Sequence, residues 1–98
     1  MRTELIRSPT AAFLQMLLNN IRPQERKKIE GTRWGAVGLV QARLIELYWA
    51  ADVAEKASNV VPVLVLGNCP QHIQMLAIFG QQAAVRTALD KIQESRRE

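Results

Sequence analysis

The sequence is poor in the residues that carry redox and covalent chemistry. Its 98 residues include one cysteine and one histidine. A single cysteine excludes an internal disulfide, which favours a reducing, cytoplasmic location. No apolar run approaches the ~20 residues of a membrane-spanning helix, and the N-terminal stretch lacks the long apolar core of a signal peptide. We therefore expect neither a membrane partner nor secretion.

Several catalytic signatures are also missing. The chain has no Gly-rich phosphate loop and no cysteine–histidine couple with a third member. Glu46, Asp52 and Glu55 share one expected helix, but nothing pairs them with a nucleophile. An enzyme is therefore not expected.

The length and composition suit a single domain over residues 1–98. The formal net charge is +4, and much of it is concentrated between Arg22 and Arg33. A cluster of this kind is typical of a solvated helix face, so we expect no nucleic-acid partner. An unrelated regulatory or nucleic-acid-binding α/β oligomer that uses this stretch is the alternative.

The first third of the chain predicts a short strand and two helices. Arg2–Ile6 suits an edge strand, and Ser8 with Pro9 suits the N-cap and first position of a helix. A second short helix is expected over Gln24–Ile29. The first helix has apolar residues at helical spacing, which predict a broad buried face: Phe13, Leu14, Met16, Leu17, Leu18 and Ile21.

A strand and a helix follow. The strand is expected over Trp34–Ala42, where Gly35 and Gly38 indicate that another element packs closely. The helix runs from about Arg43 to Ala57. Its expected buried residues are Leu44, Leu47, Tyr48, Ala51 and Ala54. Trp34, Tyr48 and Trp49 are interpreted as core residues or as anchors of a subunit interface.

The last third predicts a hairpin and a helix. The apolar stretches Val60–Leu66 and Ile73–Phe79 are rich in β-branched and aromatic residues and bounded by turn formers, as hairpin strands are. A helix from Gln81 to about Glu94 carries one apolar face: Val85, Ala88, Leu89 and Ile92.

The element order is β-α, then β-α-β-β-α. Moving the first pair to the end gives a split βαβ of ferredoxin-like type, so the order predicts an α/β sandwich that is a circularly permuted version of that fold. The small core and the apolar strands favour a symmetric oligomer.

The hairpin tip is the most distinctive stretch. It reads Gly67-Asn68-Cys69-Pro70-Gln71, with His72 after it. Gly67 is expected to supply backbone freedom, which permits a positive φ, and Pro70 stiffens the turn. We interpret His72 as a polar loop or strand residue rather than a metal ligand. A lone thiol at such a tip can be a ligand, a nucleophile or inert.

The chain resembles the circularly permuted bacterial microcompartment shell proteins that contain one BMC domain. The resemblance rests on residues 35–40, residues 50–57, the hairpin and residues 78–85. The tip is similar to the Gly-X-Cys-Pro-Gln pore motif of shell proteins from glycyl-radical-enzyme microcompartments. That resemblance implies a structural shell subunit in a flat cyclic homo-hexamer that assembles with other shell proteins.

The resemblance also implies that the hairpin loops line the central pore and that Cys69 binds an iron–sulfur cluster, of the 4Fe-4S type, shared between subunits. The expected pore-loop residues are Gly67, Asn68, Pro70, Gln71 and His72. Arg43 falls where such shell subunits keep a cation at the subunit edge.

One cysteine per chain supplies too few thiolates for a cluster, but a hexamer brings six copies of Cys69 to one axis. Three cysteines from alternate subunits are our expected ligand set, and four cysteines around an off-axis cluster are the competing one. Electron transfer across the shell, cluster delivery to redox enzymes in the lumen, and sensing are all open roles. The alternative is a metal-free hexamer whose polar loop passes a small polar metabolite.

Overall fold

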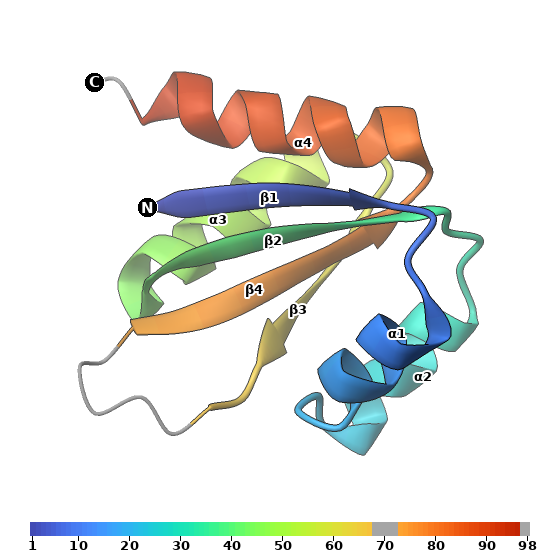
Figure 1. The fold of residues 1–98 in the computed structure, drawn as a ribbon. Helices are drawn as coiled ribbons and strands as arrows, with labels where there is room; N and C mark the ends of the chain where they lie inside the picture. Colours follow the sequence, from blue (N-terminus) through green and yellow to red (C-terminus); the bar gives the residue numbers. More distant parts are fainter. Residues whose placement is uncertain (68–72, 97–98) are drawn as a thin grey trace.

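A four-stranded antiparallel sheet with helices on both faces forms the fold (Figure 1). The computed structural model describes residues 1–67 and 73–96. The strands are β1 (Arg2–Arg7), β2 (Ala36–Arg43), β3 (Val61–Val65) and β4 (Ile73–Gly80). The helices are α1 (Ala11–Leu18), α2 (Pro23–Glu30), α3 (Leu44–Ala57) and α4 (Gln82–Ser95). The expected α/β class and element order are confirmed.

The sheet order is β1-β2-β4-β3, and each neighbouring pair is antiparallel. Strands β2 and β3 are therefore parallel to each other with β4 between them, and α3 connects them as in a split βαβ unit. Strand β1 pairs along its whole length with β2, from Arg2 opposite Gln41 to Arg7 opposite Ala36. The expected N-terminal edge strand is thus part of the main sheet.

Helices α3 and α4 cover one face of the sheet (Figure 1). The four expected residues of α4 are all buried there: Val85, Ala88, Leu89 and Ile92. Val40 and Ile78 meet them from the two central strands. Burial of such aliphatic side chains stabilises the fold by about 1.5–3 kcal/mol each.

Helices α1 and α2 cover part of the opposite face. Leu17, Ile21 and Ile29 pack in one buried cluster with Val37 and Phe79 of the central strands. The rings of Phe79 and Trp34 meet edge to face, with centroids 5.4 Å apart. Trp34 is therefore a core residue, which resolves one of the two interpretations of this tryptophan.

The start of α1 differs from the prediction. Ser8 has a left-handed φ of 45°, and its N–H donates to the Gly35 carbonyl at 2.9 Å. Thr10 is the N-cap instead, because its Oγ1 accepts the Phe13 N–H at 3.2 Å. Ser8 therefore belongs to the connection between β1 and α1, and the helix begins at Ala11.

Two expected core residues and one glycine role were also wrong. Met16 is 69% exposed and borders an open hollow over the sheet, and Tyr48 is 62% exposed, so neither is a core residue. A Cβ on Gly35 would have nothing nearer than 3.9 Å, so nothing packs closely there. Gly67, which was expected to permit a positive φ, does not adopt one.

Gly38 is the glycine at which close packing is confirmed. A Cβ built there would lie 2.9 Å from Val85 Cγ1 and 3.2 Å from both Leu89 methyls. The absence of a side chain on β2 therefore lets α4 approach the sheet.

We predict that Gly38→Ala lowers the free energy of unfolding by about 1–3 kcal/mol, because the added methyl overpacks the contact with α4. Gly35→Ala is the matched control and should change stability by less than about 1 kcal/mol. Chemical denaturation of the two variants checks this, and equal stability losses would contradict it.

Candidate functional site

The strands that flank the candidate loop are held at one end of the sheet. Val65 pairs with Met75, and Leu66, the first residue after β3, donates its N–H to the Asn20 carbonyl at 2.7 Å. Gly67 is exposed, and a Cβ on it would have no heavy atom within 4 Å. The start of the loop therefore projects into open space from an anchored strand end.

The predicted pore-loop and metal-ligand residues Asn68, Cys69, Pro70, Gln71 and His72 lie outside the described residues. Their roles therefore stay predictions.

The turn between α1 and α2 anchors the loop. Asn20 is fixed by its own N–H to the Leu17 carbonyl and by its Nδ2 to the Met16 carbonyl at 3.2 Å. The next residue, Ile21, is 2% exposed and fastens the turn to the core. Sequence reasoning missed this contact, since a bond between two main-chain groups 46 positions apart leaves no pattern in the side chains.

Arg43 lies at the same end of the sheet. It is the register partner of Ile73 and the N-cap residue of α3, and its side chain is exposed. Glu46 Oε1 accepts the Arg43 N–H at 3.3 Å. An edge contact through Arg43 stays a prediction.

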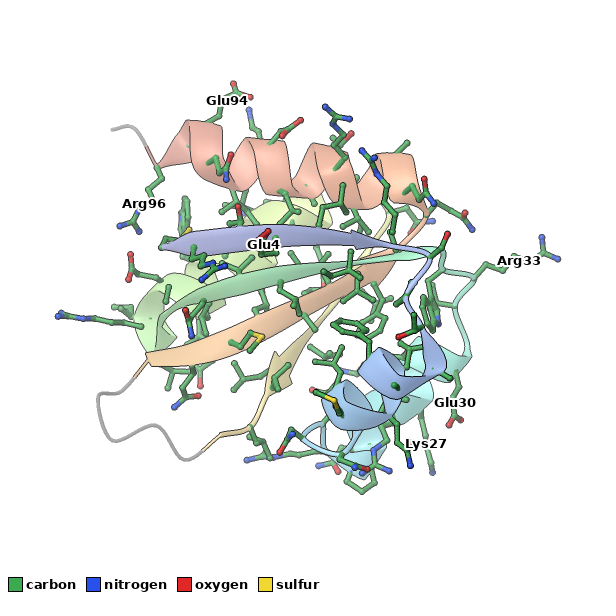
Figure 2. All side chains as sticks on the ribbon, in the orientation of Figure 1. Glu4, Lys27, Glu30, Arg33, Glu94 and Arg96 are labelled. Carbon is green, nitrogen blue, oxygen red and sulfur yellow. The ribbon has the colours of Figure 1, made fainter. Side chains whose placement is uncertain are left out.

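Glu46 also joins the start of α3 to the end of α4. Its carboxylate pairs with Arg96, which extends from the end of α4 (Figure 2). This hydrogen bond, with the weaker one from the Arg43 N–H, lowers the pKa of Glu46 below its usual value of 4.5.

The outer side of α3 carries an exposed apolar group, which we call the α3 ridge. Its members are Ile45, Tyr48 and Trp49, which are 77%, 62% and 37% exposed. Beside the ridge is an open hollow of about 270 Å³ lined by Ile45, Glu46, Trp49 and Arg96. Of the two interpretations of Tyr48 and Trp49, exposure favours the interface anchor.

The opposite face of the sheet carries an open depression, which we call the sheet groove. It consists of two hollows of about 240 and 210 Å³ that share Leu39 and Met75 in their walls. The first is bordered by Phe13 and Met16 of α1. The second is bordered by Gln41, Arg2 and Glu4. Arg2 and Glu4 form an ion pair with 3.3 Å between a guanidinium nitrogen and a carboxylate oxygen.

The basic stretch lies on α2 and the segment after it. Lys28 Nζ is 2.8 Å from a Glu25 carboxylate oxygen, which raises the pKa of Lys28. Arg26 Nε donates to the Ile21 carbonyl at 3.0 Å. Lys27 and Arg33 point outward at the periphery (Figure 2). Local contacts thus hold two of the cations, as in a solvated helix surface.

Within residues 1–67 and 73–96, no three histidine, cysteine, aspartate or glutamate side chains lie together as a metal site. The helices of that same part of the chain are too short or too polar to cross a bilayer.

The same architecture occurs in solved structures. The GrpU microcompartment shell protein from Pectobacterium wasabiae is 32% identical, with a TM-score of 0.78 over 94% of this chain and 99% of that one. The GrpU microcompartment shell protein from Clostridiales bacterium 1_7_47FAA is 35% identical, with a TM-score of 0.74 over 100% of this chain and 94% of that one. No family model and no curated protein sequence matches.

The fold is that of a BMC-domain shell protein. At this identity over nearly the whole length, the chain belongs to the microcompartment shell protein family that includes both GrpU proteins. Shell proteins are structural, so the expectation that the chain is not an enzyme is confirmed on that ground.

We predict that the contribution of Glu46 to stability depends on pH. Its folded pKa is lowered, so the contribution is fully present above pH 4.5 and is lost as the pH falls through the folded pKa. Glu46→Gln should therefore destabilise the protein at pH 6, and the difference from the wild type should shrink as the pH falls below 4.5. Thermal melts of both proteins across this range test it, and a pH-independent difference would contradict it.

Proposed function

We propose that this shell subunit assembles into a cyclic hexamer in which the Gly67–His72 loops line the central pore, together with other shell proteins. Support comes from membership of the shell family and from the position of the loop ends. Leu66 and Gly67 project from one end of the sheet, clear of the core. A loop that extends from a rigid strand end is suited to reach a symmetry axis.

We further propose that Cys69 binds an iron–sulfur cluster shared between subunits. The observation that carries this is the Gly67-Asn68-Cys69-Pro70-Gln71 stretch, inserted between β3 and β4 in a shell protein. Thiolates are the usual protein ligands of these clusters. A single copy cannot supply the ligands. Its sequence has one cysteine, and its described residues contain no group of three histidine, cysteine, aspartate or glutamate side chains that lie together. The chemistry therefore fits only if several copies contribute Cys69.

When bound, a cluster supplies one-electron redox chemistry. In this proposal the chain would hold the cluster: Cys69 would provide thiolates, Pro70 would stiffen the loop and exclude water, and N–H groups near Asn68 and Gln71 would donate to the sulfides and raise the reduction potential. Electron transfer to lumen redox enzymes, or delivery of the cluster to them, is the corresponding role. The motif is similar to that of shell proteins from glycyl-radical-enzyme microcompartments, so in this proposal the compartment encloses an enzyme of that kind.

The chain is, in this proposal, a circularly permuted form of the BMC domain. The order β1-β2-β4-β3 is the ferredoxin-like order if β1 is counted as the last strand. The two ends of the described chain lie on the same side of the molecule, where the end of α4 approaches the start of β1 (Figure 1). A hydrogen bond from Gln93 to Thr3 joins these ends.

The test is anaerobic purification of the full chain, with iron and acid-labile sulfide measured per oligomer. We predict broad visible absorption in the wild-type protein and its loss in Cys69→Ala with the oligomeric mass unchanged. Gln71→Ala, which keeps the thiol, is the matched control and should retain iron.

Colourless, iron-free wild-type hexamer from cluster-competent cells would refute the cluster and leave the metabolite pore. Mössbauer spectra with four equivalent thiolate-ligated irons would refute the three-cysteine ligand set.

A further inference from the structure

The two arms of the β3–β4 hairpin separate before the loop that joins them (Figure 1). The last register pair between the arms is Val65 with Met75. Beyond this pair, β4 extends to Ile73 alongside β2 alone. On the other arm, Leu66 donates its N–H to the Asn20 carbonyl at 2.7 Å. The loop is therefore held by the sheet at its β4 end and by the turn between α1 and α2 at its β3 end.

The helices that provide this turn are packed on the strand whose end they hold. Leu17, Ile21 and Ile29 share a buried cluster with two β3 residues, Val63 and Val65. Close-packed side chains of this kind move little relative to one another. The turn is therefore a fixed support for the end of β3.

One side chain of α2 holds the main chain of the turn. Arg26 is half-buried, and its Nε donates to the Ile21 carbonyl at 3.0 Å. The peptide group before this carbonyl carries the Asn20 oxygen that accepts the Leu66 N–H. Peptide groups are planar, so two adjacent ones differ in orientation only through the φ and ψ of the residue between them, here Ile21. Fixing the Ile21 carbonyl therefore restricts the direction of the Asn20 carbonyl.

This contact distinguishes Arg26 from its neighbours in the basic stretch. Lys28 pairs with Glu25 on the same helix, and Lys27 points outward (Figure 2). Arg26 instead reaches back from α2 to the main chain of the preceding turn. Solvation of a helix surface does not require such a contact, which indicates a structural task for this arginine.

We propose that Arg26 is a positioning residue for the Gly67–His72 loop. By holding the α1–α2 turn, it fixes the point at which the chain leaves β3 and continues toward Cys69. The effect on the cluster rests on the proposed function, whereas the hold on Leu66 does not. When each copy contributes a thiolate to a shared cluster, the same displacement of the loop is repeated in every copy. Ligand sets bind more weakly when their supports are not preorganised.

The test uses two uncharged variants that differ in one hydrogen-bond donor. The Nε2 of glutamine is as many bonds from Cα as the Nε of arginine, so Arg26→Gln keeps a donor at this position. Arg26→Met has a side chain of similar length without the donor. Both variants remove the positive charge, so a difference between them reports the hydrogen bond and not the electrostatics. Circular dichroism and sedimentation velocity verify that fold and oligomeric mass are unchanged.

The first measurement is amide hydrogen exchange at Leu66 in the full chain. Arg26→Met should exchange this amide about fivefold faster than the wild type, as expected for the loss of one supporting hydrogen bond. Arg26→Gln should exchange it at a rate close to that of the wild type. Equal rates in the two variants would overturn the hold of Arg26 on Leu66.

The second measurement is the release of iron to an excess of chelator from anaerobically purified protein. Arg26→Met should release iron about fivefold faster than Arg26→Gln and should alter the electron paramagnetic resonance spectrum of the reduced cluster. Identical release and spectra in the two variants would overturn the link from Arg26 to the cluster. Iron-free wild-type protein would instead refute the proposed cluster, and the exchange rates would still decide the hold on Leu66.

Discussion

The pairing of β2 with β4 is the constraint on which the rest of the structure depends. Their antiparallel register runs from Ala36 opposite Gly80 to Arg43 opposite Ile73. The two strands contribute side chains to the clusters on both faces of the sheet, so most of their residues are apolar in either direction, as Val37, Val40, Ala77 and Ile78 are. This register also fixes where the chain can carry function. At one end of the two strands it places the residues that flank the motif loop, the start of α3 and the sheet groove.

Much of the fold was predictable because the spacing of apolar residues along the sequence matches the helix and strand faces that are buried. The α4 residues Val85, Ala88, Leu89 and Ile92 show a helical repeat, and β2–β4 show continuous apolar runs. The predictions failed where main-chain geometry decided the outcome. Ser8 resembles an N-cap, but its left-handed backbone ends the preceding connection and Thr10 caps α1.

The candidate site was predictable in a narrower sense. The Gly67–Gln71 stretch was evident from its residue types, whereas the contact from Leu66 to Asn20 and the pairing of Glu46 with Arg96 depend on long-range proximity. Tyr48 shows the same limit. Its spacing on α3 is that of a core residue, yet it is exposed, because α3 packs through Leu47, Ala50 and Ala54 instead. A large apolar side chain at helical spacing therefore does not reveal whether it meets its own sheet or a neighbouring subunit.

The central claim is that several copies of this chain bring their motif loops to one rotation axis. The direct measurement is an electron cryo-microscopy structure of the assembled wild-type particle, in which the positions of Gly67 and Ile73 are compared with the axis. The account predicts six-fold symmetry with both residues among those nearest the axis. Loop ends at the outer edge of the ring, or a particle without cyclic symmetry, would contradict it.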